Sequence, residues 1–152
     1  MYNKYFEEIE IGDTLISRAR TITETDIVNF SGLTGDWYPL HTDAEYAKNT
    51  MFKQRIAHGL LVLSVASALI PLEPGYLVAF YGMDRVRFVN PTFIGDTIHV
   101  VAKVTDKQDK GNKGGVVTVE REVKKQTGET VVTTISKALV AKHPDNLHIG
   151  TC

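Results

Sequence analysis

The sequence contains a single cysteine, Cys152, at the last of its 152 positions. One thiol cannot form an intramolecular disulfide, which excludes a scaffold held together by disulfide bridges. A catalytic thiol is also disfavoured, because chain ends are usually mobile and catalysis needs a fixed nucleophile. A chain of this length can bury a sizeable hydrophobic core, so we expect one domain spanning residues 1–152.

The sequence also lacks an excess of charge of either sign. Lys and Arg number 17 against 18 Asp and Glu, which gives a formal charge of −1. Nucleic acid binding usually requires a basic surface, so we expect no nucleic acid partner. The opening residues, MYNKYFEEIEIGD, have neither the basic n-region nor the apolar h-region of a secretory signal. We therefore expect a cytoplasmic protein.

Long hydrophobic runs and metal-ligand spacings are missing as well. The most apolar segment, Gly59–Leu72, is too short to span a bilayer, so we expect no membrane association. The five histidines and the terminal cysteine show no spacing typical of a metal site, so we expect no metal. The segment 107–115 has the lysines and glycines of a phosphate loop without its spacing, which favours a hairpin loop.

The first half of the sequence carries helix signals. A strand is expected over residues 14–22, and a helix from Glu24 to about Gly32 follows it, with Thr23 as N-cap. A second short helix is expected just after His41, with Thr42 as its cap.

The second half predicts a sheet around a helix. Gly59–Leu72 is apolar on every face, which is typical of a buried central helix. From Tyr76 onward, four β-branched alternating runs are separated by turn signals. The pattern predicts an α+β domain in which an antiparallel sheet wraps a single long helix.

The stretch GDWYPLH, residues 35–41, places Asp36 and His41 five positions apart. Neither a helix nor a strand brings such positions to the same face. Pro39 favours an extended Tyr38, so the stretch is expected to be a loop, in which side chains can be placed freely. On spacing alone, a turn aspartate and an ordinary surface histidine are favoured over a shared task.

Three blocks of the sequence together resemble a known family. FSGLTGDWYPLHTD, RIAHGLLVLSVASALI and RVRFVNPTFIGDTIHV are similar to motifs of the MaoC-like dehydratases, the (R)-specific enoyl-CoA hydratases of the hot-dog fold. The blocks occur in the family's order, and the resemblance runs from about Ile9 to Ala141. It implies a long central helix wrapped by a curved antiparallel β-sheet, and a homodimer or higher homo-oligomer.

The resemblance also implies roles for individual residues. Asp36, Pro39 and His41 match the family motif Asp-x-Asn-Pro-x-His, with Tyr38 in place of the asparagine. Asp36 and His41 would hold one water and add it across the double bond of an enoyl thioester. By position, the backbone N–H of Gly59 would bind the thioester carbonyl, and Ser67 would support the catalytic groups.

Elementary chemistry agrees with these roles. Hydration at C3 places negative charge on the thioester oxygen, and a helix N-terminus offers free N–H groups and a favourable dipole. The ordinary pKa of histidine lets it stay neutral near pH 7, which makes His41 the better proton acceptor. Ser67 could equally bond the carbonyl four residues earlier in its helix.

The resemblance therefore implies a lyase of fatty acid metabolism that interconverts trans-2-enoyl-CoA and (R)-3-hydroxyacyl-CoA. Coenzyme A enters as part of the substrate, and no cofactor is expected. The alternatives are a hydratase for a branched or carboxylated short-chain enoyl-CoA, a non-catalytic acyl-CoA binding protein, and a hot-dog thioesterase. Tyr38 either shortens the acyl pocket or faces outward, and Arg85 and Arg87 could bind coenzyme A phosphates or simply face solvent.

Overall fold

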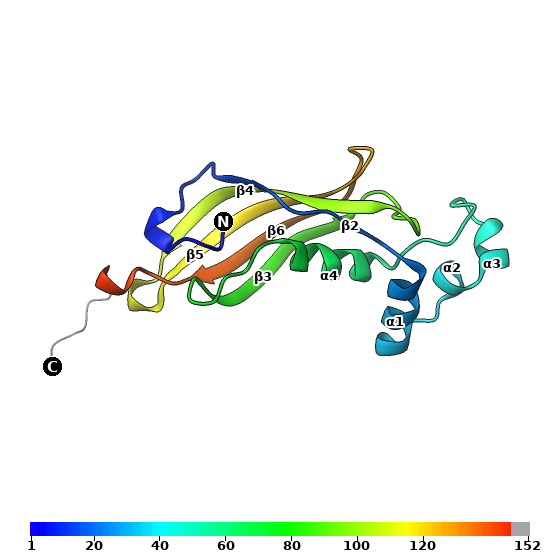
Figure 1. Cartoon of the computed structure of the whole chain (residues 1–152), viewed down its shortest axis with the longest axis horizontal. Helices are drawn as coiled ribbons and strands as arrows, with labels where there is room; N and C mark the ends of the chain where they lie inside the picture. The colour runs from blue at the N-terminus through cyan, green and yellow to red at the C-terminus, as the bar shows by residue number, and fades with distance from the viewer. Residues whose placement is uncertain (147–152) are drawn as a thin grey trace.

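The structure is a computed structural model that describes residues 1–146. Its main element is a long antiparallel sheet (Figure 1). The sheet has the strand order β1-β4-β5-β6-β3, and β2 pairs with β4 beside β1. Its long strands are β3 (Leu77–Phe88), β4 (Thr97–Asp109), β5 (Gly115–Lys125) and β6 (Thr130–Val140). All four predicted runs are strands, and segment 107–115 belongs to the β4–β5 hairpin, so these predictions are confirmed. Cys152 lies outside the described residues.

The strand expected over residues 14–22 is two shorter pieces, β1 (Thr14–Ile16) and β2 (Arg20–Thr21), both paired with β4. Ser17 lies between them, and its side chain forms one of the hydrogen bonds to β4 that a main-chain group would form in a regular strand. Its Oγ accepts a 2.8 Å hydrogen bond from the backbone N–H of Val100, while its own N–H donates to the Val100 carbonyl. This side-chain bond replaces a main-chain one and interrupts the strand.

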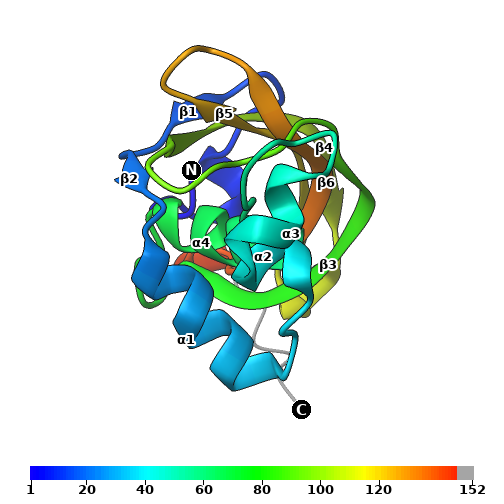
Figure 2. The same cartoon turned by 90° about the vertical axis from the view of Figure 1, so that its right-hand side faces the viewer.

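Helix α4 (Gly59–Leu69) lies along the concave face of the sheet, which curves around it in the end-on view (Figure 2). Leu61, Val62 and Val65 face the sheet and are buried. The helix is not buried on every side as expected, because the sheet covers one side only and Leu60 on the other side is 61% exposed. The helix ends before Leu72 because Pro71 favours an extended conformation of Ile70.

Three further helices project beyond one end of the sheet: α1 (Glu24–Thr34), α2 (Pro39–Thr42) and α3 (Ala44–Lys48) (Figure 1). Single 3-10 turns lie at Phe6–Glu8, Gly111–Lys113 and Pro144–Asn146. The capping box of Thr23 and Asp26 is present as predicted. The cap of α3 is Asp43 and not Thr42, whose hydroxyl instead bonds the carbonyls of Trp37 and Tyr38.

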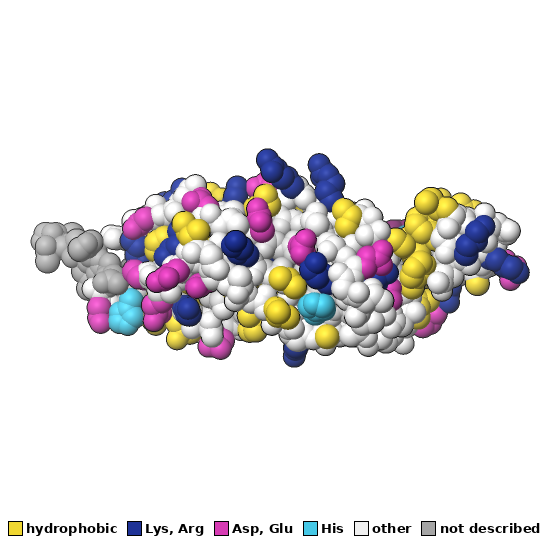
Figure 3. Space-filling model, turned by 90° about the horizontal axis from the view of Figure 1, so that it is seen from above, with side chains coloured by type: hydrophobic (Ala, Val, Ile, Leu, Met, Phe, Trp, Pro, Cys, Tyr) yellow, Lys and Arg dark blue, Asp and Glu magenta, His cyan; other side chains and the backbone are white. Residues whose placement is uncertain are grey.

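The surface mixes charges of both signs. On the face shown in Figure 3, Lys and Arg side chains alternate with Asp and Glu. Over the described residues, no helix combines the length and the apolarity needed to cross a membrane.

Candidate active site

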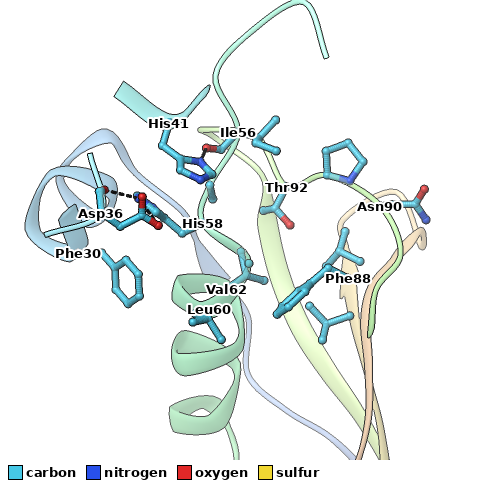
Figure 4. A pocket seen from close by; sticks show the side chains of 15 residues that line it. Phe30, Asp36, His41, Ile56, His58, Leu60, Val62, Phe88, Asn90 and Thr92 are labelled. Atoms are coloured by element: carbon cyan, nitrogen blue, oxygen red, sulfur yellow. Dashed lines mark hydrogen bonds and ion pairs between the residues drawn. The ribbon is translucent and has the colours of Figure 1, made fainter. Parts of the chain in front are cut away.

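A cavity of about 270 Å³ opens where the α1–α2 loop meets the first turn of α4 (Figure 4). Asp36, His41 and Gly59 all line it, so the structure brings together three of the residues singled out by sequence. Apolar side chains complete the wall, among them Phe30 and Phe88. The cavity thus combines a small polar cluster with an apolar lining, the composition typical of small-molecule sites.

Asp36 is positioned by the way α1 ends. Gly35 takes the left-handed conformation (φ 79°) and its N–H bonds the carbonyl of Ser31, a common helix stop that favours glycine. Asp36 follows at once, and its Oδ1 accepts a 3.2 Å bond from the N–H of Tyr38. The local fold therefore fixes the carboxylate, of which 49% remains exposed.

His41 is positioned by a new helix and by a distant carbonyl. Pro39 is the first residue of α2, where its fixed φ and missing N–H are tolerated, and His41 lies in that helical turn. The Nδ1 of His41 lies 2.8 Å from the carbonyl oxygen of Ile56. A carbonyl only accepts, so Nδ1 donates, and in the neutral ring Nε2 carries the free lone pair. This tautomer makes Nε2 a proton acceptor.

Asp36 and His41 do meet, although their spacing fits neither a helix nor a strand. The chain leaves α1 at Gly35 and begins α2 at Pro39, so that the two side chains converge. Potential ligand atoms of Asp36, His41 and His58 all lie within 4.8 Å of one another.

His58 is a member of this cluster that the sequence analysis did not single out. It is 2% exposed, and its Nε2 lies 3.1 Å from the backbone carbonyl of Asp36 and 3.3 Å from the Oγ of Ser31. Its ring stacks on that of His41, with centroids 3.9 Å apart. The available signal was its place immediately before Gly59 in the segment AHG.

Burial sets the charge state of His58. Desolvation lowers its pKa below the ordinary 6.5, the bond to the Asp36 carbonyl opposes this, and the neighbouring His41 lowers it further. Its Nδ1 has no partner among the described residues, and a buried cationic ring would leave an unpaired N–H there. His58 is therefore the neutral tautomer that donates from Nε2 and holds the Asp36 backbone in place.

Gly59 begins α4, so its N–H has no acceptor within the helix. The ring of Phe88 packs directly against it: a Cβ at this position would lie 2.8 Å from two atoms of the ring. Phe88 thus packs on the first turn of the central helix. Because glycine has no Cβ, Phe88 can approach this closely and form part of the cavity wall.

The structure does not bring Ser67 or Tyr38 into this cavity. The Ser67 Oγ donates to the carbonyl of Ser64, three residues earlier, and the side chain lines a different cavity. Tyr38 is 53% exposed, its hydroxyl lies 3.2 Å from that of Tyr46, and it does not line the Asp36 cavity. Of the two orientations considered for Tyr38, the outward one is observed, and the structure does not support the alternative in which Tyr38 shortens the acyl pocket.

The cluster of Asp36, His41 and His58 has the donor types of a divalent metal site. Its arrangement is less suited to one, because the two imidazoles stack nearly parallel, at 30°, instead of converging on a point. The Nε2 of His58 is also engaged by the Asp36 carbonyl and Ser31. The absence of a resident metal stays a prediction.

Comparison with known proteins places the chain in a family. Residues 7–127 match the model of the MaoC like domain. The protein MaoC of Klebsiella aerogenes is 44% identical over 101 residues, covering 65% of this chain and 30% of that protein. An (R)-specific enoyl-CoA hydratase of Rhodospirillum rubrum is 41% identical over 101 residues, covering 66% of this chain and 69% of that protein. The chain belongs to the MaoC-like domain family.

Solved structures agree on the fold. A monoamine oxidase regulatory protein of Archaeoglobus fulgidus is 48% identical, with a TM-score of 0.87 over 93% of this chain and 96% of that one. A double hot-dog protein of Mycobacterium tuberculosis reaches a TM-score of 0.82 at 20% identity over 93% of this chain and 45% of that one, a likeness of fold alone. The chain therefore has the predicted hot-dog fold, a curved antiparallel sheet around a central helix.

Proposed function

We propose that this protein is an enoyl-CoA hydratase that reversibly adds water to a trans-2-enoyl-CoA and yields the (R)-3-hydroxyacyl-CoA. The proposal is supported by membership of a family that includes proteins named (R)-specific enoyl-CoA hydratase. The observation that carries it is the His41–Ile56 bond, which leaves Nε2 of the neutral His41 ring as a base near the Asp36 carboxylate.

In the proposed reaction the thioester carbonyl lies at the N-terminus of α4. A water held between Asp36 and His41 attacks C3 while the Nε2 of His41 accepts its proton. Negative charge then moves through C2 to the thioester oxygen, where the N–H of Gly59 and the helix dipole stabilise it. The pair of His41 and Asp36 then delivers a proton to C2. The hydroxyl of the water is thus added to C3 and a proton to C2, so no redox cofactor is required.

His58 acts in this scheme as a positioning residue. It donates to the backbone carbonyl of Asp36 and supports one face of the His41 ring. Both contacts restrict the geometry of the pair without placing His58 on the reacting atoms, and well-fixed geometry lowers the entropy cost of reaction.

Incubation with crotonyl-CoA tests the proposal directly. Hydration removes the absorbance of the conjugated thioester without releasing free thiol, and chiral analysis of the product should give the (R) alcohol. Release of thiol would instead identify a thioesterase, and binding without either change would identify a non-catalytic acyl-CoA binding protein. Comparing crotonyl-CoA with branched and carboxylated thioesters distinguishes the remaining substrate classes.

We also propose that the protein works as a homodimer. Strand β3 is an edge of the sheet, and several of its apolar side chains are about half exposed or more, including Val78, Phe80 and Tyr81. An edge strand with free main-chain groups and apolar side chains favours pairing with a second copy. Light scattering measures the molar mass of the wild type and of Phe80→Lys: we expect a wild-type dimer that the lysine weakens. A wild-type monomer would contradict the proposal.

A further inference from the structure

Arg121 is a buried cation on the inner face of the sheet. It lies in β5 between Glu120 and Glu122, which point to the other face and are exposed, whereas Arg121 is 7% exposed. Its side chain therefore projects toward α4 with those of Val119 and Val123. Arginine is almost never buried in this way without a partner for its charge.

The partners of Arg121 do not include a carboxylate. Among the described residues, no acidic side chain lies within ion-pair distance of it, and its Nε makes no hydrogen bond. One guanidinium nitrogen, Nη2, donates to the hydroxyl of Tyr2 at 3.0 Å, and the Tyr2 ring centroid lies 5.8 Å from Cζ. A neutral hydroxyl and a ring face compensate a buried charge only in part, and an unpaired buried charge is costly.

A second cavity, of about 260 Å³, adjoins this guanidinium and is distinct from the Asp36 cavity. We call it the Arg121 cavity. Besides Arg121 and Tyr2, its wall is apolar apart from Ser67 and includes Ile70, Leu77, Phe80 and Met83. An apolar body with one cationic end suits an aliphatic ligand that carries a single anionic group.

We infer that the Arg121 cavity binds a carboxylate carried on a short aliphatic chain. The guanidinium would pair with the carboxylate through its planar N–H groups, and the Tyr2 hydroxyl, which already accepts from Nη2, can donate its own proton to the ligand. The aliphatic part would lie against Leu77, Phe80 and Met83 of β3. This assignment explains why an arginine occupies a position that faces the core.

The carboxylate has two possible sources. Gly59 and Ser67 lie on the same helix, about 12 Å apart along its axis, so a short acyl group held at Gly59 does not reach Arg121 of the same chain. The ligand is then either a free carboxylic acid or the carboxylated acyl group of a thioester held by a second copy. The second source rests on the proposed function, and the first does not.

Calorimetric titration of the wild type with hexanoate tests the site, with hexanamide as an uncharged probe of the same length. We expect hexanoate to bind at least tenfold more tightly than hexanamide, since hydrogen bonds to charged groups are the stronger ones. Arg121→Met should remove that preference. The matched control is Asp36→Asn, which changes the other cavity and should leave hexanoate affinity within twofold.

A second variant keeps the test decisive if Arg121→Met fails to fold. Leu72→Trp adds bulk at an exposed residue that lines the cavity while Arg121 stays in place, and it should weaken hexanoate at least tenfold. Equal affinities for hexanoate and hexanamide would overturn the inference. So would hexanoate binding that survives both Arg121→Met and Leu72→Trp but is lost in Asp36→Asn.

The source is decided by kinetics with crotonyl-CoA and with glutaconyl-CoA, the same thioester bearing a carboxylate on its terminal carbon. A thioester ligand predicts that Arg121→Met lowers kcat/KM at least tenfold for glutaconyl-CoA and less than twofold for crotonyl-CoA. A free-acid ligand predicts that Arg121→Met weakens hexanoate binding and leaves kcat/KM for both thioesters unchanged. If the wild type hydrates neither thioester, the proposed function fails, while the hexanoate titration still decides the inference.

Discussion

The imidazole rings of His41 and His58 stack with their centroids 3.9 Å apart and their planes inclined by 30°. Each ring is held by a different backbone carbonyl: His41 donates from Nδ1 to Ile56, and His58 from Nε2 to Asp36. The stack therefore links α2 to the loop before α4. Any change in one ring is expected to shift the other.

Replacement of His58 tests its positioning role. His58→Phe keeps the ring stack but loses the donor to Asp36, whereas in His58→Gln the side-chain amide can still supply a donor near the Nε2 position. We expect His58→Phe to lower kcat about tenfold or more with a smaller change in KM, and His58→Gln to recover a substantial part of the loss. Equal kcat values for the two variants would show that the donor to Asp36 is unimportant.

The lowered pKa of His58 predicts a pH dependence of stability. In the unfolded chain this histidine titrates near its ordinary value of about 6.5, and in the folded protein it titrates lower. Below about pH 6.5 the unfolded state therefore binds more protons than the folded state, so the free energy of unfolding falls as the pH falls, by at most about 1.4 kcal/mol per pH unit from this group. Urea unfolding between pH 7.5 and 5.5 should show a smaller decrease of the free energy of unfolding in His58→Gln than in the wild type. The same pH dependence in both proteins would refute the lowered pKa of His58.

Asp36 and His41 should each be essential to turnover. Loss of a general acid or base commonly costs about 10² to 10⁴ in rate, so we expect Asp36→Asn and His41→Ala to lower kcat for crotonyl-CoA by at least about 10². Neither side chain is fully buried, and circular dichroism should show folded proteins. A variant with near-wild-type kcat would remove that residue from the mechanism.

Gly59 offers a matched pair of substitutions. Gly59→Ala keeps the N–H but places a methyl against Phe88, whose ring must shift to make room for it. Gly59→Pro adds similar bulk and also removes the N–H. Proline is tolerated at the first helical position, and the preceding His58 already has an extended ψ of 134°.

We expect both Gly59 variants to lower kcat/KM, and Gly59→Pro to lower kcat at least tenfold further than Gly59→Ala, because only proline removes the donor to the thioester oxygen. Steady-state kinetics with crotonyl-CoA measures the difference. Equal kcat values in the two variants would rule out an oxyanion role for this N–H.

The outward orientation of Tyr38 predicts little effect of its replacement. Tyr38→Phe loses only the contact with the Tyr46 hydroxyl, at an exposed position, and should change kcat less than twofold. Tyr38→Asn should leave the ratio of kcat/KM between short-chain and medium-chain enoyl-CoA unchanged. A shift of that ratio toward longer chains would show that Tyr38 restricts the acyl pocket after all.

Local sequence was sufficient for much of the fold. The capping box of Thr23 and Asp26, the alternation in the four long strands, and the turn signals between them depend on neighbouring residues, and the structure confirms them. One error arose where a tertiary contact competes with local preference, because the Ser17 hydroxyl replaces a main-chain bond to the distant Val100. The other arose between neighbouring candidates: Asp43 caps α3, and the Thr42 hydroxyl bonds carbonyls of the preceding turn.

The candidate site likewise has features that the sequence predicted and features that only the structure showed. The motif residues Asp36, His41 and Gly59 were identified from the sequence because their order along the chain resembles a family pattern, and the structure places all three around one cavity. The roles of His58, the outward Tyr38 and Arg121, which lacks a carboxylate partner, depend on which side chains the fold brings together. Local sequence encodes backbone conformation, whereas burial, desolvation and the pairing of charges are properties of the packed structure, and only the tertiary structure could decide them.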